Sequence, residues 1–372
     1  MTPQESNRRD FIKTAGSAVA AIGALSASSG AASAASQLTA TSTAPDLSNG
    51  ANNFYTSNQV VMQKVAFNNQ YKMRVVGNLF TPKTLNRNSK HPAIVIGHPM
   101  GAVKEQSSNL YAQKLAEQGF VTLAIDQSFW GESAGQPRNV VAPEIYAEAF
   151  SAAVDYLGTQ SFVGRQQIGV LGICGSGSFV ISAAKIDPRM RAIATVSMYD
   201  MGAVNRQGLN HSQTPEQRRQ TIAEAAEQRY AEFTGSAIKS TGGTVHALDK
   251  DTHPIQREFF DFYRTPRGEF TPGGSSRQLT THPTLTSNVK FMNFYPFNDI
   301  ETISPRPLLF ITGDQAHSKE FSEEAYRLAG QAKELVMVPS AGHVDLYDRV
   351  NLIPWDKLNT FFQKNLALNS LA

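Results

Sequence analysis

Short apolar runs that alternate with helical stretches are the feature that most constrains how this chain can fold. Brief, unbroken apolar runs are typical of strands buried on both faces of a sheet, and helical connections make neighbouring strands parallel. A hairpin pattern precedes them, with strands at Val60 to Phe67 and Tyr71 to Phe80 and a turn at Asn68 and Asn69. The later runs are Ala93 to Ile96, Val121 to Ile125, Ile168 to Leu171, Ala192 to Val196, Leu308 to Thr312 and Leu335 to Val338.

Amphipathic stretches separate these runs at the spacing that covering helices require. The pattern therefore predicts an α/β fold built on a mostly parallel, eight-stranded sheet with helices on both faces. The expected helices are Leu110 to Gln118, Pro143 to Leu157, Ser178 to Lys185, Glu320 to Ala329 and Pro354 to Phe362.

One region, about 201–305, breaks the alternation between the sixth and seventh predicted strands. It contains a polar helix at Pro215 to Phe233, followed by a stretch rich in Thr, Gly, Pro and aromatic residues. An insertion at this place is expected to form a lid over a site at the sheet edge. Its aromatic side chains either line a pocket or form the insertion's own core, and the pattern alone leaves both open: Phe259, Phe260, Phe262, Tyr263, Phe291, Phe294, Tyr295 and Phe297.

Composition excludes several classes of function. The net charge is only +3 over 372 residues, and no dense Lys/Arg tract is present to neutralise a row of phosphates, so nucleic acid is not an expected partner. The single cysteine excludes an intramolecular disulfide and any cysteine-based metal cluster. No cofactor or metal is expected.

The N-terminus resembles a twin-arginine export signal. Arg8 and Arg9 precede an apolar stretch over 15–25 and the small residues Ala32-Ser33-Ala34. The apolar part is short of the roughly 20 residues needed to span a bilayer, and the small residues suit a signal peptidase. We expect 1–34 to be the signal, read by the twin-arginine machinery, and the mature protein to be periplasmic or secreted without a stable membrane anchor. Residues 35–57 read as a flexible leader and 58–372 as the folded domain.

A nucleophile elbow is predicted where the strand Ile168 to Leu171 runs into Gly172-Ile173-Cys174-Gly175-Ser176 and then a helix. Such a turn lifts one side chain above the sheet in a strained conformation and needs small neighbours two positions away on either side. Cys174 meets this requirement with Gly172 before it and Ser176 after it, although glycine is usual at the second position. Making Ser176 the nucleophile would lose the glycine on the strand side, so Cys174 is the preferred candidate.

A cysteine nucleophile needs a base, and the base needs a partner that orients it. In enzymes with such an elbow the acid and the histidine follow the nucleophile in that order. Asp314 comes directly after Leu308 to Thr312, and His343 lies on the loop after the last strand, so Asp314 is expected to orient His343. With an imidazolium and a helix N-terminus nearby, the pKa of Cys174 is expected to be low.

The oxyanion of the reaction needs two backbone N–H donors. One is expected from Gly175, directly after the nucleophile. The other is expected from Met100, on the loop Gly97-His98-Pro99-Met100-Gly101 that follows the third predicted strand.

The motifs together resemble those of the dienelactone-hydrolase-related branch of the α/β-hydrolases. The likeness lies in GHPMGAVKEQ from Gly97, DQSFWGESAGQPR from Asp126, GVLGICGSG from Gly169, and SPRPLLFITGD with SAGHVDLYD. It implies the α/β-hydrolase fold and a cysteine in the elbow, and it spans Val60 to about Asn365. Lys104, Glu105 and Gln106 form part of the likeness and are interpreted as helix-start and packing residues.

The predicted reaction is attack of Cys174 on the carbonyl of a small acyl substrate, an ester, lactone or thioester, followed by hydrolysis of the acyl-enzyme by water that His343 activates. Two alternatives remain at this point. One is acyl transfer to an alcohol or amine on the same fold. The other is a periplasmic binding protein that retains the fold without catalysis, because fold alone does not establish function.

Overall fold

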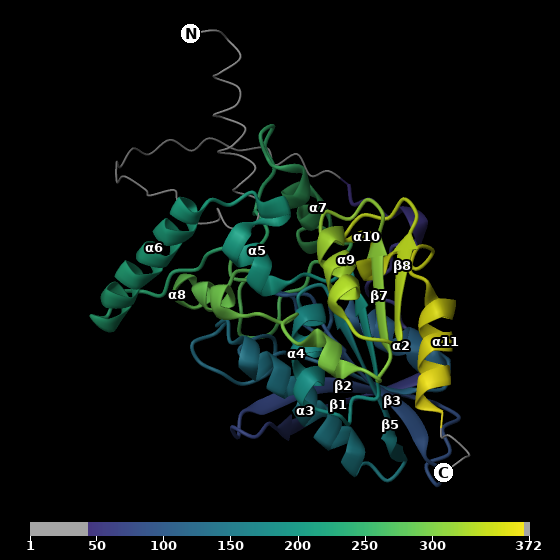
Figure 1. Ribbon diagram of the computed structural model, residues 1–372. Helices are drawn as coiled ribbons and strands as arrows, with labels where there is room; N and C mark the ends of the chain where they lie inside the picture. The colour runs from purple at the N-terminus through teal and green to yellow at the C-terminus, as the bar shows by residue number, and fades with distance from the viewer. Residues whose placement is uncertain (1–43, 368–372) are drawn as a thin grey trace.

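The computed structural model describes residues 44–367, so the predicted signal over 1–34 lies outside the described residues. One mixed sheet of eight strands, in the order β1-β2-β4-β3-β5-β6-β7-β8, forms the centre of the molecule (Figure 1). The strands are β1 Val60–Asn68, β2 Arg74–Pro82, β3 His91–Gly97, β4 Val121–Ile125, β5 Val163–Ile173, β6 Ala192–Val196, β7 Leu308–Gly313 and β8 Lys333–Val338.

Pairing is antiparallel for β1 with β2 and for β2 with β4, and parallel across the rest of the sheet. This confirms the α/β class and the mostly parallel eight-stranded sheet. The central strands β4 and β6 are buried at every position, as their unbroken apolar sequences predict. Parallel strands carry their carboxyl ends to one edge, so the loops after β3, β5, β6, β7 and β8 meet there.

Helices cover both faces of the sheet. The helix α2 lies on the same face as α11, where the Tyr111 and Trp355 rings are 4.9 Å apart, and α3, α4 and α9 lie on the opposite face (Figure 1). The covering helices are α2 Ser108–Glu117, α3 Pro143–Thr159, α4 Ser176–Ile186, α9 Lys319–Leu328 and α11 Trp355–Leu366, and the short helix α10 Asp345–Asp348 lies in the loop after β8.

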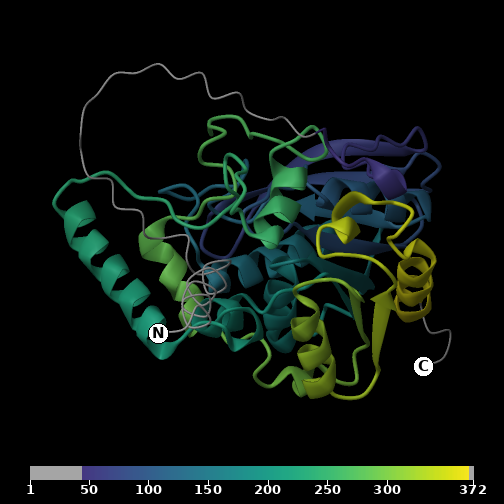
Figure 2. The same ribbon diagram turned by 90° about the horizontal axis from the view of Figure 1, so that it is seen from above.

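The region between β6 and β7 folds over the carboxyl edge of the sheet, at the place predicted for a lid. Most of it packs on the body, but only Ala225 and Gln228 of α6 are buried, and this helix projects sideways from the molecule (Figures 1 and 2). Its elements are α5 Met201–Gln207, α6 Pro215–Phe233, α7 Pro254–Tyr263, α8 Leu285–Asn288 and the short 3-10 turns η2 Leu209–His211, η3 Val289–Asn293 and η4 Ile300–Ile303.

Two predictions near the start of the domain are wrong. The β1–β2 turn is longer than Asn68-Asn69, because the Asn69 side chain accepts from the N–H groups of Tyr71 and Met73 and closes a wider loop. The described part of the predicted flexible leader, 44–57, is packed against the body. There the Asn53 side chain, 2% exposed, accepts from the Ser107 N–H at 2.6 Å. The folded domain therefore begins well before residue 58. Within the described residues, no helix has the length and apolar character to cross a bilayer.

Candidate active site

Cys174 lies in a sharp turn between β5 and α4. Its φ is 53°, a conformation that non-glycine residues rarely adopt, and its N–H donates to Val196 O at 2.9 Å. Gly172 is required on the strand side because a Cβ there would lie 2.3 Å from Ser176 O. This is the strand–turn–helix geometry of a nucleophile elbow, at the predicted residue.

Ser176, the alternative nucleophile, is turned away from the site. Its side chain is fully buried and donates to His98 O at 2.5 Å, which ties the elbow to the loop after β3. His98 braces the same loop: its Nε2 accepts from Gln127 N–H at 3.1 Å, so its Nδ1 carries the proton and donates to Pro99 O at 2.8 Å. Serine at this elbow position therefore has a positional role that glycine could not supply.

Two backbone N–H groups act on the Cys174 sulfur, those of Gly175 and Met100. They come from the two predicted places, the helix start after the nucleophile and the loop after β3. The two residues are in close proximity, since a Cβ on Gly175 would lie 2.5 Å from Met100 Cβ. Donors that converge beside the sulfur are also close to where a carbonyl oxygen would lie during attack on that sulfur.

The thiol itself is buried, with Cys174 only 6% exposed. Burial raises the pKa of the Cys174 thiol to about 11, although hydrogen bonds from Tyr347, Gly175 and Met100 act in the opposite direction. The structure contradicts the predicted low pKa of Cys174, because none of the residues over 44–367 places a cation beside the sulfur and desolvation outweighs the donors. The resting group at neutral pH is the thiol.

His343 is fully buried, and the Tyr347 side chain lies between it and the nucleophile Cys174. Its Nε2 is 2.9 Å from the Tyr347 hydroxyl, and that hydroxyl is hydrogen-bonded to Cys174. Its Nδ1 is 2.6 Å from the Ser318 hydroxyl, and Ser318 is also fully buried. Burial, together with His317 nearby, lowers the pKa of His343 well below its ordinary value, so the ring is neutral at pH 7.

The structure does not bring Asp314 to His343, which corrects the predicted contact. Asp314 Oδ1 accepts instead from Ser340 N–H at 2.8 Å and from the Gln315 side chain at 3.1 Å. Within residues 44–367, no carboxylate oxygen lies within ion-pair distance of His343. The position that a carboxylate would take at Nδ1 is taken by Ser318, at the start of α9.

A carboxylate does reach the neighbouring histidine. Glu258, on the lid helix α7, lies 3.0 Å from His317 Nδ1, and its other oxygen accepts from Val344 N–H at 2.7 Å. The rings of His317 and His343 are 4.6 Å apart. Glu258 therefore links the lid to the histidine loop without touching His343.

Tyr347, Ser318 and Glu258 were not found by sequence reasoning. The spacing of four residues from His343 to Tyr347, which is the spacing of neighbours on one helix face, is the signal that could have indicated Tyr347. Nothing in the sequence pattern could have indicated the other two, because their roles depend on how α7 and α9 meet the loop.

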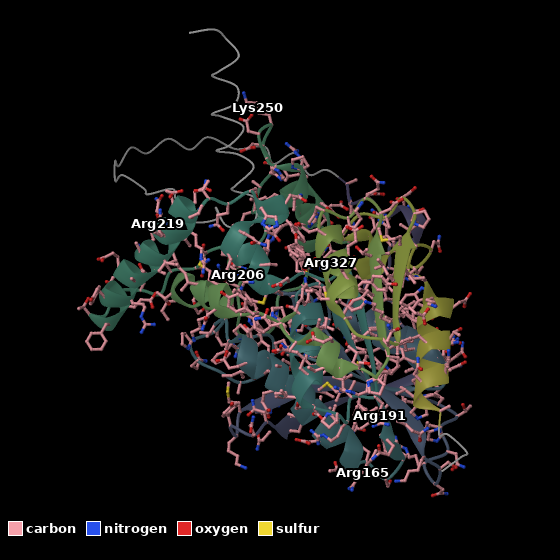
Figure 3. All side chains as sticks on the ribbon, viewed as in Figure 1. Arg165, Arg191, Arg206, Arg219, Lys250 and Arg327 are labelled. Atoms are coloured by element: carbon pink, nitrogen blue, oxygen red, sulfur yellow. The ribbon has the colours of Figure 1, made fainter. Side chains whose placement is uncertain are left out.

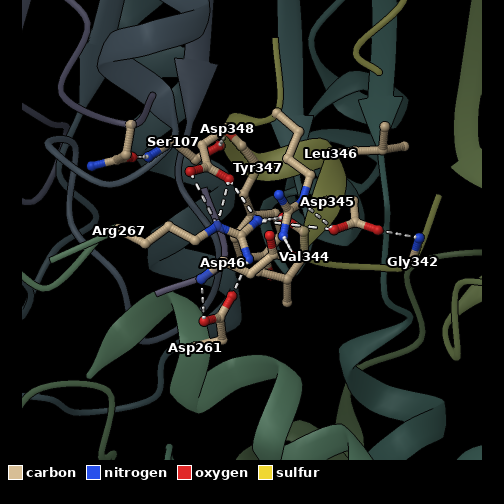
Figure 4. A network of polar contacts seen from close by, with 12 residues as sticks. Asp46, Ser107, Asp261, Arg267, Gly342, Val344, Asp345, Leu346, Tyr347 and Asp348 are labelled. Carbon is tan, nitrogen blue, oxygen red and sulfur yellow. Dashed lines mark hydrogen bonds and ion pairs between the residues drawn. The ribbon is translucent and has the colours of Figure 1, made fainter. Parts of the chain in front are cut away.

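The segment that carries His343 and Tyr347 is held from behind by buried polar contacts (Figure 4). The Ser107 hydroxyl donates to Tyr347 O at 3.0 Å. Arg267, from the lid region, donates to Val344 O at 3.1 Å and to Asp348 at 2.7 Å, and the Asp348 side chain is fully buried. Asp345 and Asp348 thus serve local structure, Asp345 by accepting from Gly342 N–H at 2.7 Å.

Replacing Arg267 by alanine is expected to reduce the free energy of unfolding by about 3–5 kcal/mol, because Asp348 would remain buried without its partner. Chemical denaturation followed by circular dichroism measures this loss. Arg219→Ala is the matched control, since its ion pair with Glu216 on α6 is exposed, with 67% and 73% of the two side chains accessible (Figure 3). The control should change stability by less than about 1 kcal/mol. Equal losses in the two variants would contradict the assignment.

Lys104 lies at the centre of a second buried cluster, below the loop after β3. Its ammonium, 1% exposed, is within 2.8 Å of Asp126 and Glu105 and within 2.7 Å of Glu132. The Lys104 N–H also donates to Asp126 at 2.8 Å. These contacts fix the loop that carries Met100. The interpretation of Lys104 as a packing residue therefore agrees with the structure, in which Lys104 acts through ion pairs.

A cavity of about 130 Å³ opens directly above Cys174. Most of its wall comes from the lid region, and no charged side chain lines it among the described residues. Of the aromatic residues left open by the sequence, Phe259, Tyr263 and Phe291 line the cavity, whereas Phe262 and Phe297 are buried elsewhere and Tyr295 is 45% exposed. Both readings of the aromatic residues are thus partly right.

A strained cysteine elbow beneath a lid, with a histidine after the last strand, defines an α/β-hydrolase. Residues 76–233 match the model of the dienelactone hydrolase family. The chain is also 45% identical over 314 residues to the uncharacterized protein PA2218 of Pseudomonas aeruginosa, over 84% of this chain and 83% of that protein. The chain belongs to the dienelactone hydrolase family, and it is an enzyme of the ester or lactone hydrolase type.

The crystal structure of PA2218 superposes with a TM-score of 0.79 at 44% identity, covering 84% of this chain and 96% of that one. The uncharacterized protein YcjY of Escherichia coli is 32% identical over 291 residues, which is 77% of this chain and 92% of YcjY. A shorter match, 37% identical over 105 residues, joins 28% of this chain to 33% of the thiohydrolase aneE of Aspergillus aculeatus.

Proposed function

We propose that the enzyme hydrolyses a small ester, lactone or thioester through a covalent acyl-enzyme on Cys174. The observation that carries this proposal is the position of Cys174: strained at φ 53°, at the floor of the cavity, with two backbone N–H groups beside its sulfur. Strain of this kind persists only where the surroundings impose it, and it is concentrated at functional sites.

The proton of the thiol needs an acceptor, since the resting group is protonated. We propose that it passes to the Tyr347 hydroxyl while the Tyr347 proton passes to His343 Nε2, along the two hydrogen bonds described above. His343 must then carry its own proton on Nδ1 and donate it to Ser318. Sulfur attacks the carbonyl carbon, and the oxyanion that forms is stabilised by the N–H groups of Gly175 and Met100.

Collapse of the tetrahedral intermediate breaks the bond to the leaving group. The imidazolium returns its proton through Tyr347 to the departing alkoxide or thiolate, which leaves a thioester on Cys174. A water molecule then gives a proton to His343 by the same route as it attacks the thioester carbonyl. The second tetrahedral intermediate breaks its bond to the Cys174 sulfur and releases the acid, and the imidazolium returns its proton through Tyr347 to that sulfur, which restores the thiol. These steps use protein groups and water only.

The proposed substrates include thioesters for two reasons. The Cys174 sulfur that attacks and the substrate sulfur that leaves would be chemically alike, and the thiohydrolase aneE shares part of this sequence. The experiment that tests the proposed function is steady-state turnover of short p-nitrophenyl esters and of matched acyl thioesters. Turnover above the background hydrolysis rate is expected. Its absence across the panel, with intact fold, would contradict the proposal.

The reactivity of Cys174 should follow its raised pKa. Alkylation of the folded enzyme by iodoacetamide is expected to be slow at pH 7 and to accelerate about tenfold per pH unit up to pH 11, because only the thiolate reacts. Since the chain has one cysteine, the mass of the labelled protein reports this residue alone. A rate that already levels off below pH 8 would contradict the raised pKa.

We also propose that the enzyme is exported by the twin-arginine route, on the basis of Arg8 and Arg9 before the short apolar stretch. Replacing both by lysine is expected to leave uncut protein in the cytoplasm, measured by fractionation and mass. Unchanged recovery outside the cytoplasm would refute this proposal.

A further inference from the structure

Within residues 44–367, no carboxylate bonds to His343 as it would in a catalytic triad, so other contacts must orient its ring. The Ser318 hydroxyl at Nδ1 is a neutral partner, and Asp314 is bonded to Ser340 N–H. His343 lies on the loop after β8, and loops are the more mobile parts of a fold. The contacts that hold this loop therefore determine whether Nε2 stays in place beside the Tyr347 hydroxyl.

Glu258, on the lid helix α7, holds this loop at two points. Its Oε1 accepts from the N–H of Val344, the residue next to His343, at 2.7 Å. Its Oε2 lies 3.0 Å from His317 Nδ1, which must carry the proton because a carboxylate oxygen can only accept. The His317 ring in turn packs against the His343 ring, with the two centroids 4.6 Å apart. Glu258 therefore restrains His343 through the backbone and through the neighbouring ring.

Glu258 differs from the other carboxylates that contact this part of the chain. Asp345 is paired with Arg349 at 2.6 Å, and Asp348 is paired with Arg267 at 2.7 Å. Among the described residues, no lysine or arginine lies within ion-pair distance of Glu258. Its two oxygens are bonded instead to the N–H group and the ring beside the catalytic histidine.

The helix that carries Glu258 also forms part of the cavity wall. Phe259 and Tyr263 of α7 line the cavity above Cys174, whereas Glu258 lies outside its lining. The Phe259 ring meets the His343 ring edge-on, with the centroids 5.7 Å apart. One helix thus shapes the acyl site and holds the histidine. Removal of the Glu258 carboxylate should therefore act on the histidine and leave the cavity wall in place.

We propose that Glu258 is a positioning residue for the reaction: from the lid it orients His343, so that Nε2 stays within reach of the Tyr347 hydroxyl. This inference rests on the proposed function, because it takes His343 as the base. The lid then has a second task besides enclosing the acyl group. The carboxylate that supports the histidine comes from the insertion between β6 and β7, and not from the end of β7.

Glu258→Ala should lower kcat for p-nitrophenyl pentanoate by about 10- to 100-fold, less than the about 10⁴-fold loss for a triad carboxylate that bonds its histidine directly. KM should stay within about threefold, because Glu258 does not line the cavity. Glu258→Gln should recover turnover to within about fivefold of the wild type. Its amide oxygen can accept from Val344 N–H, and its amide nitrogen can donate to His317 once the ring proton moves to Nε2.

Asp314→Asn is the matched control, since Asp314 also accepts from an N–H of the same loop but bonds to neither histidine. It should keep kcat within about fivefold, and a thermal melt beside each assay checks that the variants are folded. Wild-type kcat in Glu258→Ala would overturn the inference. So would a folded Glu258→Gln that is as slow as Glu258→Ala, or a loss that appears in KM alone.

The proton of the His317 ring separates this inference from the proposed function, because it is observed without turnover. In wild-type protein labelled with 15N-histidine at pH 7.5, nuclear magnetic resonance should show a proton on His317 Nδ1, and in Glu258→Gln on Nε2 alone. The signal is assigned by its loss in His317→Asn. If these states are found and no ester is turned over, the proposed function fails and the positioning of the histidine loop by Glu258 stands. A wild-type ring protonated on Nε2 alone would overturn the inference even where esters are hydrolysed.

Discussion

Replacement of Cys174 by alanine is expected to lower kcat/KM for short esters by about 10⁴-fold or more, because no other side chain at the elbow can form the acyl-enzyme. The variant should remain folded, since the change removes only one buried sulfur. Activity on p-nitrophenyl esters, measured beside a thermal melt, separates chemistry from folding.

Ser176→Ala is the matched control for that change. The Ser176 hydroxyl donates to His98 O and faces away from the cavity, so its loss should reduce turnover by no more than about tenfold through a looser oxyanion loop. If Ser176→Ala removes activity and Cys174→Ala retains it, the nucleophile is the serine.

Replacement of His343 by alanine is the second change with a large expected effect, a loss of about 10⁴-fold in kcat. It removes the end of the proton path from Cys174 through Tyr347. Pre-steady-state release of p-nitrophenol should slow to the same extent, because acylation itself needs the base.

Asp314→Asn provides the contrast with His343→Ala. Asp314 bonds to Ser340 N–H and makes no contact with His343, so this variant should keep turnover within about fivefold. A loss of several orders of magnitude in Asp314→Asn would show that the carboxylate reaches the histidine during the reaction, against the arrangement described here.

The sequence predicts much of the fold because buried strands appear in it as short apolar runs. The strands β4, Val121–Ile125, and β6, Ala192–Val196, have the predicted bounds. Asp126 ends the first apolar run, and Arg191 and Ser197 flank the second. The strand β5, Val163–Ile173, is longer than predicted because it includes exposed Arg165 and Gln166, which carry no apolar signal. Hydrophobic periodicity indicates burial, so it does not predict the part of a strand that extends beyond its neighbours and is exposed.

The site is predictable to the extent that backbone geometry determines it. Cys174, Gly175 and Met100 lie together because the elbow and the loop after β3 are set by the sheet. The partner of His343 could not be predicted, because it depends on how the start of α9 meets the last loop, and there Ser318 approaches Nδ1 while Asp314 does not. Side-chain pairing between loops leaves no periodic signal in the sequence.

If Cys174 carries the acyl group during turnover, enzyme quenched in acid during hydrolysis of p-nitrophenyl pentanoate should contain a species heavier than the free enzyme by one pentanoyl group. Peptide mapping should locate this group on Cys174, and mass spectrometry should find none in Cys174→Ala. An adduct on Ser176 would contradict the assignment of the acyl group to Cys174. So would the same adduct formed by Cys174→Ala while the wild type turns over the ester.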